Sequence, residues 1–430
     1  MPTEEPVVIQ QVLAVSGFGG FYVDDLQAVK AGRAVPDGMF LTGSPVTPGF
    51  TRIREPAEVL SILLLLSDRQ VAQGDCVSVV YSGYGGRDPV FRAETAAAQV
   101  ERDLAPALVG RDVRRFRPLA EACEAEWGTG PHPLHTALRY GLSQALLHAT
   151  ALARRRAVAE IVAEEYGVSL RPRLVPICAQ SGDDRYLGAD KMIMKQVPVI
   201  PHGNFTHVRA LGPRGEALRT YVRWLRERVA CFGPPGYRPV FHLDLYGTAG
   251  ELFDHDPVAV ADFLIELEAE ARPHRLQIEA PLFGESQADV LRRMAALVAA
   301  LEQRGSHIWV VADEFANTLA DIQAFAEARA AHMIQVKMPD LGGVTQSIAA
   351  VLACHRHGVC AFLGGTCNET DHASRMTVHI AVALGADQIY NKPGLSVDEG
   401  YMIAYNELQR VLAVLAARGY PTGPGDHQPR

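Results

Sequence analysis

Three acidic residues in the second half of the sequence each follow a short, mostly apolar run. They are Asp244, Glu279 and Asp313, spaced 35 and 34 residues apart. Runs of this kind are typical of buried strands, and carboxylates at the ends of neighbouring strands converge on one point. Three converging carboxylates repel one another unless a cation neutralises them. Because oxygen ligands suit a hard cation, these residues predict a Mg²⁺ site.

Lys337 follows the next apolar run, and Gln335 lies two residues before it. Side chains alternate along a strand, so both point to the same side. Burial and a neighbouring cation both lower the pKa of a lysine. A lowered pKa lets Lys337 take a proton from carbon near neutral pH. For a lysine considered alone, the alternative is a surface salt bridge.

Other polar residues hold comparable positions in the sequence. His202 follows an apolar run and could be a second acid or base, although a structural, hydrogen-bonded histidine fits that position about equally well. Gln180, after the first run of this region, is a candidate donor to a carboxylate. The turn Gly364–Glu369 comes before a helix, where backbone N–H groups favour an anion.

Eight apolar runs alternate with amphipathic stretches in this half of the chain, and such a pattern predicts a (β/α)₈ barrel. In this fold, functional residues gather at the C-terminal ends of the strands. The predicted strands are Leu174–Ala179, Val197–Ile200, Pro239–Leu243, Leu276–Ile278, Ile308–Ala312, Met333–Val336, Val359–Leu363 and Ala386–Tyr390. The predicted helices include Pro257–Ala271, Ser286–Gln303, Thr318–Ala330, Val344–His355 and Ser374–Leu384.

The first 168 residues follow a different pattern, without strand–helix–strand alternation. The pattern predicts strands over Val59–Ser67 and Cys76–Tyr81. It predicts helices over Glu94–Leu108, Arg115–Trp127 and Leu134–Tyr166. We therefore predict an N-terminal α+β capping domain over residues 1–168 and a catalytic barrel over 169–420. Residues 421–430, rich in Pro and Gly, are expected to be a disordered tail.

The overall composition limits which binding partners and which cellular location we expect for this protein. A net charge of −8 gives no sign of binding to nucleic acid or to an anionic membrane surface. No apolar stretch is long enough to span a bilayer, and the N-terminus does not resemble a secretion signal. Seven scattered cysteines suit reduced thiols in a cytoplasmic protein. The expected partner is a small molecule.

Several longer stretches of the sequence resemble those of a known family. The ordered Asp, Glu and Asp resemble the metal ligands of the enolase superfamily, and strings across nearly the whole chain closely resemble the 3-methylaspartate ammonia-lyases. These strings are Tyr81-Ser-Gly, Gly85-Gly-Arg-Asp-Pro89, Ala179-Gln-Ser-Gly-Asp-Asp-Arg-Tyr186, His242-Leu-Asp-Leu-Tyr-Gly247, Val311-Ala-Asp-Glu314, Pro339-Asp-Leu-Gly-Gly-Val344, Gly364-Gly-Thr-Cys-Asn-Glu-Thr370 and Lys392-Pro-Gly394.

The resemblance implies a reversible elimination of ammonia from (2S,3S)-3-methylaspartate to give mesaconate. It implies Mg²⁺ held by the three carboxylates, removal of the C3 proton by Lys337, and His202 acting on the opposite face. It further implies K⁺ as an activator and a homodimer. The residues it assigns to the carboxylates and the amino group are Gln180, His202, Gln335, Thr366 and Cys367.

Three positions depart from the family pattern. Val80 stands where a Gln is usual, Phe362 where a Tyr is usual, and Tyr390 where a Leu is usual. All three are expected near the substrate side chain, so they leave the substituent at C3, and the amine, open. Neutral drift is the alternative explanation.

Two other functions remain to be weighed. Another reaction of the enolase superfamily, such as dehydration, racemisation or cycloisomerisation, would use much of the same site, but the string Thr366–Thr370 favours the lyase. A catalytically silent homologue is the second alternative. The full set of three carboxylates, Lys337 and His202 argues against it.

Overall fold

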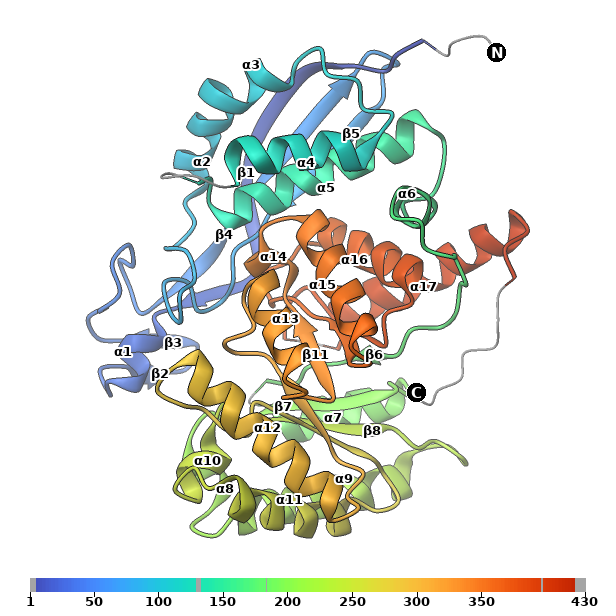
Figure 1. Ribbon diagram of the computed structural model, residues 1–430. Coiled ribbons are helices and arrows are strands. Elements are labelled where there is room, and N and C mark those ends of the chain that lie inside the picture. Colours follow the sequence, from blue (N-terminus) through green and yellow to red (C-terminus); the bar gives the residue numbers. More distant parts are fainter. Residues whose placement is uncertain (1–4, 129–132, 183, 396, 422–430) are drawn as a thin grey trace.

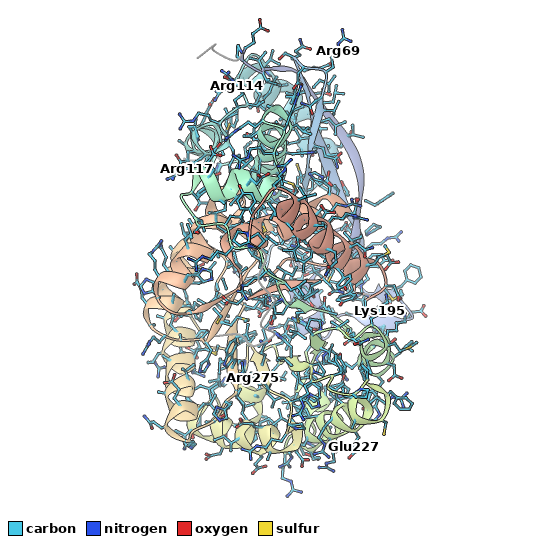
Figure 2. The ribbon with its side chains drawn as sticks, turned by 90° about the vertical axis from the view of Figure 1, so that its right-hand side faces the viewer. Arg69, Arg114, Arg117, Lys195, Glu227 and Arg275 are labelled. Carbon is cyan, nitrogen blue, oxygen red and sulfur yellow. The ribbon has the colours of Figure 1, made fainter. Side chains whose placement is uncertain are left out.

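The computed structural model describes residues 5–128, 133–182, 184–395 and 397–421, and Figure 1 shows it as a small α+β region above a larger barrel. The molecule is long in this direction. Arg69, in the turn between two strands of the small region, and Glu227, on a barrel helix, lie near its opposite ends in Figure 2. The predicted tail from residue 422 onward lies outside the described residues.

The small region is built on a three-stranded antiparallel sheet in the order β1-β4-β5. The strands are β1 (Ile9–Asp24), β4 (Arg54–Leu66) and β5 (Val71–Cys76). Helix α5 (Thr136–Ala153) packs so closely on β5 that a Cβ atom at Gly74 would meet the Gly141 carbonyl oxygen. The absence of a side chain at Gly74 therefore permits this helix–sheet contact.

Further helices pack against the sheet or against α5. They are α2 (Ala93–Gln99), the π-helical turn η1 (Val100–Leu104), α3 (Ala105–Leu108), α4 (Phe116–Trp127) and α6 (Val158–Glu165). Between β1 and β4 the chain forms α1 (Leu26–Lys30) and a hairpin of β2 (Val35–Asp37) and β3 (Phe40–Thr42), which lie beside the barrel (Figure 1).

Eight parallel strands close into a barrel in the order β6-β7-β8-β9-β10-β11-β12-β13. They are β6 (Ile177–Cys178), β7 (Val199–Asn204), β8 (Val240–Asp244), β9 (Leu276–Glu279), β10 (Trp309–Ala312), β11 (Met333–Val336), β12 (Cys360–Leu363) and β13 (Gln388–Tyr390). The closed barrel confirms the predicted fold class, and each of the eight predicted strands overlaps an observed one.

Helices between the strands form the outer layer. They are α7 (Arg185–Met194), α8 (Val208–Leu211), α9 (Glu216–Phe232), α10 (Thr248–Leu252), α11 (Pro257–Ala271), α12 (Gln287–Gln303), α13 (Leu319–Glu327), α14 (Met338–Leu341), α15 (Val344–Arg356), α16 (Asp371–Leu384) and α17 (Glu399–Ala417). Three of these helices are capped by a side chain at their N-terminus, which fixes where each begins. The side chains of Ser286, Thr318 and Thr370 accept hydrogen bonds from backbone N–H groups in α12, α13 and α16, respectively.

Two expectations for the small region are wrong. Cys76–Tyr81 is not a strand, because the chain leaves the sheet at Cys76 and enters the barrel mouth. There the Ser78 carbonyl oxygen accepts hydrogen bonds from Thr366 Oγ1 at 3.3 Å and Asn368 Nδ2 at 3.2 Å. The long helix predicted over Leu134–Tyr166 is broken into α5 and α6 by a left-handed residue, Arg155, with φ +52°.

The glycine-rich run Gly17–Gly20 lies inside β1, a strand that was not predicted from the sequence. This strand continues to the barrel, where the Gly20 N–H donates to the Asn368 carbonyl oxygen at 3.2 Å. A Cβ atom at Gly20 would strike Cys367 and Pro393. A glycine at this position therefore lets the strand touch the barrel mouth directly.

Among the described residues, no helix is both long enough and apolar enough to cross a membrane.

Candidate active site at the barrel mouth

A cavity of about 110 Å³ opens where the C-terminal ends of the barrel strands meet the small region. All nine site residues predicted from the sequence line it: Gln180, His202, Asp244, Glu279, Asp313, Gln335, Lys337, Thr366 and Cys367. The small region contributes further lining residues, among them Phe21, Val80, Tyr81 and Arg87. The structure therefore brings together every predicted site residue.

Four residues in or just after consecutive barrel strands have an uncommon backbone conformation. His202, Tyr246, Ala280 and Phe315, at or just after β7 to β10, have φ values of +42°, +47°, +45° and +68°. A left-handed conformation is sterically disfavoured for residues other than glycine. Such residues cluster at functional sites, where the surrounding fold holds the strained backbone in place.

The three carboxylates lie on adjacent strands and are almost fully buried. Asp244 is 1% exposed, Glu279 0% and Asp313 3%. Burial and the nearby Glu279 carboxylate raise the pKa of Asp244 well above its usual value. Burial likewise raises the pKa of Glu279, although its hydrogen bond with His242 opposes the effect. The carboxylate cluster therefore has too little neighbouring positive charge to offset its burial.

Lys337 forms an ion pair with Asp313, with Nζ 2.5 Å from Oδ2. Burial lowers the pKa of Lys337, but the carboxylates of Asp313 and Glu314 outweigh burial and raise that pKa. The expected lowering is therefore not observed. The prediction included the positive charge of a bound cation, which would lower the pKa of Lys337. The protein groups alone place carboxylates next to the ammonium, and their negative charge raises this pKa.

Two sets of residues in the cavity have donors for a metal ion. The carboxylates offer oxygen atoms, and Asp313 Oδ1 is buried without a hydrogen-bond partner among the described residues. Donor atoms of His202, His242 and Glu279 also lie within 4.8 Å of one another. However, both ring nitrogens of His242 already have close partners. Oxygen donors suit Mg²⁺ and imidazole donors suit zinc, so the carboxylates fit Mg²⁺ better.

His202 is buried, and neither of its ring nitrogens has a hydrogen-bond partner among the described residues. Its ring stacks on His242 at a centroid distance of 4.5 Å, and its Nε2 lies 3.3 Å from Glu279 Oε2. Burial lowers the pKa of His202 to about 4. A neutral imidazole that faces a cavity and makes no well-aligned hydrogen bond suits a ligand-binding role better than a structural one.

Sequence reasoning missed the residues that support the carboxylates. His242 Nε2 lies 2.7 Å from Glu279 Oε2, and His242 Nδ1 lies 2.8 Å from Gln277 Oε1. From the other side, Gln335 Nε2 donates to Glu279 Oε1 at 2.8 Å. His242 and Gln277 alternate with the buried apolar residues of β8 and β9, and this was the available signal: polar residues facing the barrel interior.

Sequence reasoning also missed the carboxylate of Glu314, which is half-buried beside Asp313. Burial and the Asp313 charge raise the pKa of Glu314 to about 8, and its Oε2 has no hydrogen-bond partner among the described residues. Arg87 brings a positive charge to the same corner. Its guanidinium donates to Asp340 at 3.0 Å and to Asn317 at 3.1 Å, which ties the small region to the barrel.

The turn Gly364–Glu369 is held from behind by a buried ion pair. Lys392 Nζ donates to Glu369 Oε1 at 2.9 Å and to the Gly364 carbonyl oxygen at 2.8 Å. Glu369 Oε2 accepts the Thr366 N–H at 2.7 Å. Both charged side chains are fully buried. The pair therefore sets the conformation of the turn that carries Thr366 and Cys367 into the cavity.

The three unusual positions do not all reach the cavity. Val80 and Tyr390 line it, and the Tyr390 hydroxyl lies 3.9 Å from Cys367 Sγ. Phe362 does not line it: the ring is fully buried, with its centroid 6.0 Å from that of Tyr390. Of the three residues expected near the substrate side chain, Phe362 therefore does not reach the cavity; it belongs to a cluster of buried residues with Tyr390 and Met333.

Comparison with known proteins gives a consistent result over the whole chain. Residues 7–167 match the family model of the methylaspartate ammonia-lyase N-terminus, and residues 169–417 match that of its C-terminus. Methylaspartate ammonia-lyase 1 of Carboxydothermus hydrogenoformans is 47% identical over 407 residues, which are 95% of this chain and 97% of that protein. The enzyme of Clostridium tetanomorphum is 45% identical, over 95% of this chain and 99% of the relative.

Solved structures agree with the sequences. The crystal structure of beta-methylaspartase from Clostridium tetanomorphum, a magnesium complex, has a TM-score of 0.90 at 45% identity and covers 96% of this chain and 100% of that one. The Citrobacter amalonaticus enzyme, containing (2S,3S)-3-methylaspartic acid, has a TM-score of 0.92 at 45% identity, over 95% and 100% of the two chains. Muconate lactonizing enzyme, at 16% identity and a TM-score of 0.58, shares the fold alone.

Proposed function

The chain belongs to the methylaspartate ammonia-lyase family and is a carbon–nitrogen lyase, and we propose that it eliminates ammonia reversibly from 3-methylaspartate, giving mesaconate, or from a closely related substituted aspartate. The cavity is smaller than the ~300–1,000 Å³ that drug-sized ligands occupy, which supports a small amino-acid substrate. Gln180, Gln335, Thr366 and Cys367 would hold its carboxylates and amino group.

One observation carries this proposal: two candidate bases stand on opposite walls of the barrel. His202 belongs to β7 and Lys337 follows β11, and these strands are four places apart in either direction around the closed barrel. A substrate between them presents one face to each residue. In the proposed mechanism Lys337 takes the C3 proton of the (2S,3S) substrate, and His202 serves the opposite face.

We further propose that Asp244, Glu279 and Asp313 hold Mg²⁺. When bound, the cation would stabilise the negative charge that develops on the substrate carboxylate as the C3 proton leaves. The protein residues do the remaining work: Lys337 holds the abstracted proton, and Gln335 keeps Glu279 in place. Activation by K⁺ remains a proposal that rests on the resemblance. The seven unpaired cysteines support a cytoplasmic location.

An assay of a substrate panel tests the proposed function. Aspartate and its 3-alkyl, N-alkyl and 3-hydroxy derivatives would be incubated with the protein, Mg²⁺ and K⁺, and alkene formation followed by absorbance. We expect product from 3-methylaspartate or a close relative, and loss of activity on addition of a chelator. If no substituted aspartate yields an alkene, the proposed function is wrong.

His242 is expected to determine how tightly the metal is held. Replacing it in His242→Asn removes the imidazole that orients Glu279, and loss of such a supporting partner typically weakens metal binding ~10–100-fold. Calorimetric titration with Mg²⁺ or Mn²⁺ measures the effect. The matched control is His274→Asn, because His274 is also buried but bonds the Pro239 carbonyl oxygen instead. Equal affinities in both variants and the wild type would contradict this role.

The substrate preference is expected to depend on the wall formed by Val80 and Tyr390. Relative to the usual residues, Tyr390 adds bulk and a hydroxyl, Val80 loses an amide, and Phe362 loses a hydroxyl behind Tyr390. We expect weak activity on plain 3-methylaspartate and a higher kcat/KM on an aspartate with another substituent. The triple change Val80→Gln, Phe362→Tyr and Tyr390→Leu should shift the preference by ~10–200-fold.

The control for this prediction is the wild-type panel. If the unmodified protein converts 3-methylaspartate within the usual range of ~10⁴–10⁸ M⁻¹s⁻¹ and nothing in the panel does better, the three positions do not set specificity.

A further inference from the structure

Helix α14 carries the candidate base, because Lys337 is the residue at which this helix begins. The helix is a single turn, Met338–Leu341, and a helical turn of this length is not stable in isolation. Its position must therefore be set by contacts with the rest of the protein. Figure 1 shows α14 on the side of the barrel that meets the small region.

The small region holds the C-terminal end of α14 through helix α5. Gly342, which ends α14, has φ +76°, and a Cβ atom there would lie 3.1 Å from the Arg139 guanidinium. The Val344 N–H then donates to Ser143 Oγ at 2.7 Å. These contacts fix where the helix ends, and the beginning of the helix, which bears Lys337, depends on a further contact.

Arg87 provides that contact from a loop of the small region. Its Nε donates to Asp340 Oδ1 at 3.2 Å and to Oδ2 at 3.0 Å, and Asp340 lies in α14, three residues after Lys337. The Asp340 N–H in turn donates to the Lys337 carbonyl oxygen at 3.0 Å. Two successive contacts therefore join the Arg87 guanidinium to the backbone of Lys337.

The same guanidinium also holds the loop that follows the neighbouring strand. Its Nη2 donates to Asn317 Oδ1 at 3.1 Å, and Asn317 Nδ2 donates back to the Gly85 carbonyl oxygen at 3.1 Å. Asn317 follows β10, which ends just before the carboxylate Asp313. Arg87 thus bridges the loop after β10, which begins with Asp313, and the helix after β11, which begins with Lys337.

The Arg87–Asp340 pair is buried, and burial limits what it adds to stability. Each of the two side chains is only 4% exposed. A buried ion pair often contributes little net stability, because the desolvation of both charges offsets their attraction. An arginine nevertheless fixes direction as well as distance, since its donors form a rigid planar fork. The pair is therefore better suited to positioning than to stabilising the fold.

We propose that Arg87 is a positioning residue, which sets where the Lys337 ammonium stands relative to Asp313 and the bound substrate. It acts through Asp340 and Asn317 and does not touch the reacting atoms. The inference rests on the proposed function, in which Lys337 removes the C3 proton. Proton transfer needs the base within hydrogen-bond reach of that proton, and a displacement of about 1 Å can lower the rate ~10²-fold.

The rates of two diastereomers test this role of Arg87. In Arg87→Met, kcat for the (2S,3S) substrate should fall by ~10²-fold with little change in KM. The (2S,3R) reaction, which His202 serves in the proposed mechanism, should lose much less, so the ratio of the two rates should fall. Asp340→Asn should lower the same ratio. A general structural defect would instead lower both rates together.

A double variant guards against misfolding, because Arg87→Met leaves the buried Asp340 carboxylate without its ionic partner. Arg87→Met combined with Asp340→Asn removes both charges. It should show the same low ratio as either single variant, because all three break one contact. Arg228→Met is the matched control: Arg228 makes a two-pronged pair with Asp190 on the outer helices of the barrel, at 2.6 and 2.7 Å. It should leave both rates near those of the wild type.

Hydrogen–deuterium exchange gives a readout that does not depend on activity, since it reports local opening of the backbone. Exchange in residues 338–344 should be faster in Arg87→Met and in the double variant, and unchanged in Arg228→Met. Unchanged exchange in this segment overturns the proposal, and so does an equal loss of both diastereomer rates. A wild type that converts neither diastereomer refutes the proposed function, whereas the exchange rates still decide whether Arg87 fixes the segment that bears Lys337.

Discussion

Lys337→Ala is expected to lower kcat for the (2S,3S) substrate by ~10²–10⁴-fold or more, since loss of a general base typically costs that much. His202→Ala should instead mainly impair the (2S,3R) diastereomer, because His202 stands on the opposite wall of the barrel. Steady-state assays of both diastereomers with both variants measure this exchange of preference.

A surface lysine provides the control for this prediction. Lys191→Ala removes an ammonium that pairs with Asp398 on the outside of the barrel, and it should leave both rates near those of the wild type. Metal affinity measured by calorimetry shows whether the Lys337 variant still assembles its site. Near-normal turnover of the (2S,3S) substrate by a folded Lys337→Ala protein would disprove the assignment.

Lys392→Met is expected to lower the free energy of unfolding by ~3–5 kcal/mol, because removing one partner of a buried ion pair leaves an uncompensated charge. Here the charge is that of Glu369, which is fully buried and also accepts the Thr366 N–H. Denaturant unfolding followed by circular dichroism measures the change. In variants that remain folded, KM should rise, because the turn bearing Thr366 is no longer fixed.

The double variant Lys392→Met with Glu369→Gln separates charge from packing. With both charges removed, most of the lost stability should return. The exposed pair Lys191–Asp398 is the matched control, since surface ion pairs contribute only ~0–1 kcal/mol. If the double variant is no more stable than Lys392→Met alone, burial of an unpaired charge is not the cause of the loss.

The barrel could be predicted from sequence because each of its strands is buried on both faces. Such strands are short apolar runs separated by helices with an apolar stripe. The same logic placed the site, since a polar residue ending an apolar run stands at the barrel mouth. Asp244, Glu279, Asp313 and Lys337 were all found in this way.

The rest depended on contacts between segments distant in sequence. β1 was missed because the glycines at 17, 19 and 20 resemble a loop, and their strand conformation is fixed by pairing with β4 and by contact with the barrel. The protein groups raise the pKa of Lys337 because Asp313 and Glu314 lie beside its ammonium, whereas the predicted lowering counted the charge of a bound cation.

Phe362 illustrates the remaining limit of the sequence. As a departure from the family pattern it was expected near the substrate side chain, but its ring is fully buried with Tyr390 and Met333 and does not reach the cavity. The sequence specifies the order of residues along a strand, whereas packing inside the folded barrel decides which of them reach the cavity.

The position of the metal ion in a crystal grown with Mg²⁺ and a substituted aspartate tests the central claim most directly. We predict an ion about 2.1 Å from one oxygen of each of Asp244, Glu279 and Asp313, with C3 of the ligand facing Lys337. An ion bound instead by His202, His242 and Glu279, or carboxylates more than about 4 Å from the ion when coordination needs about 2.1 Å, would contradict it.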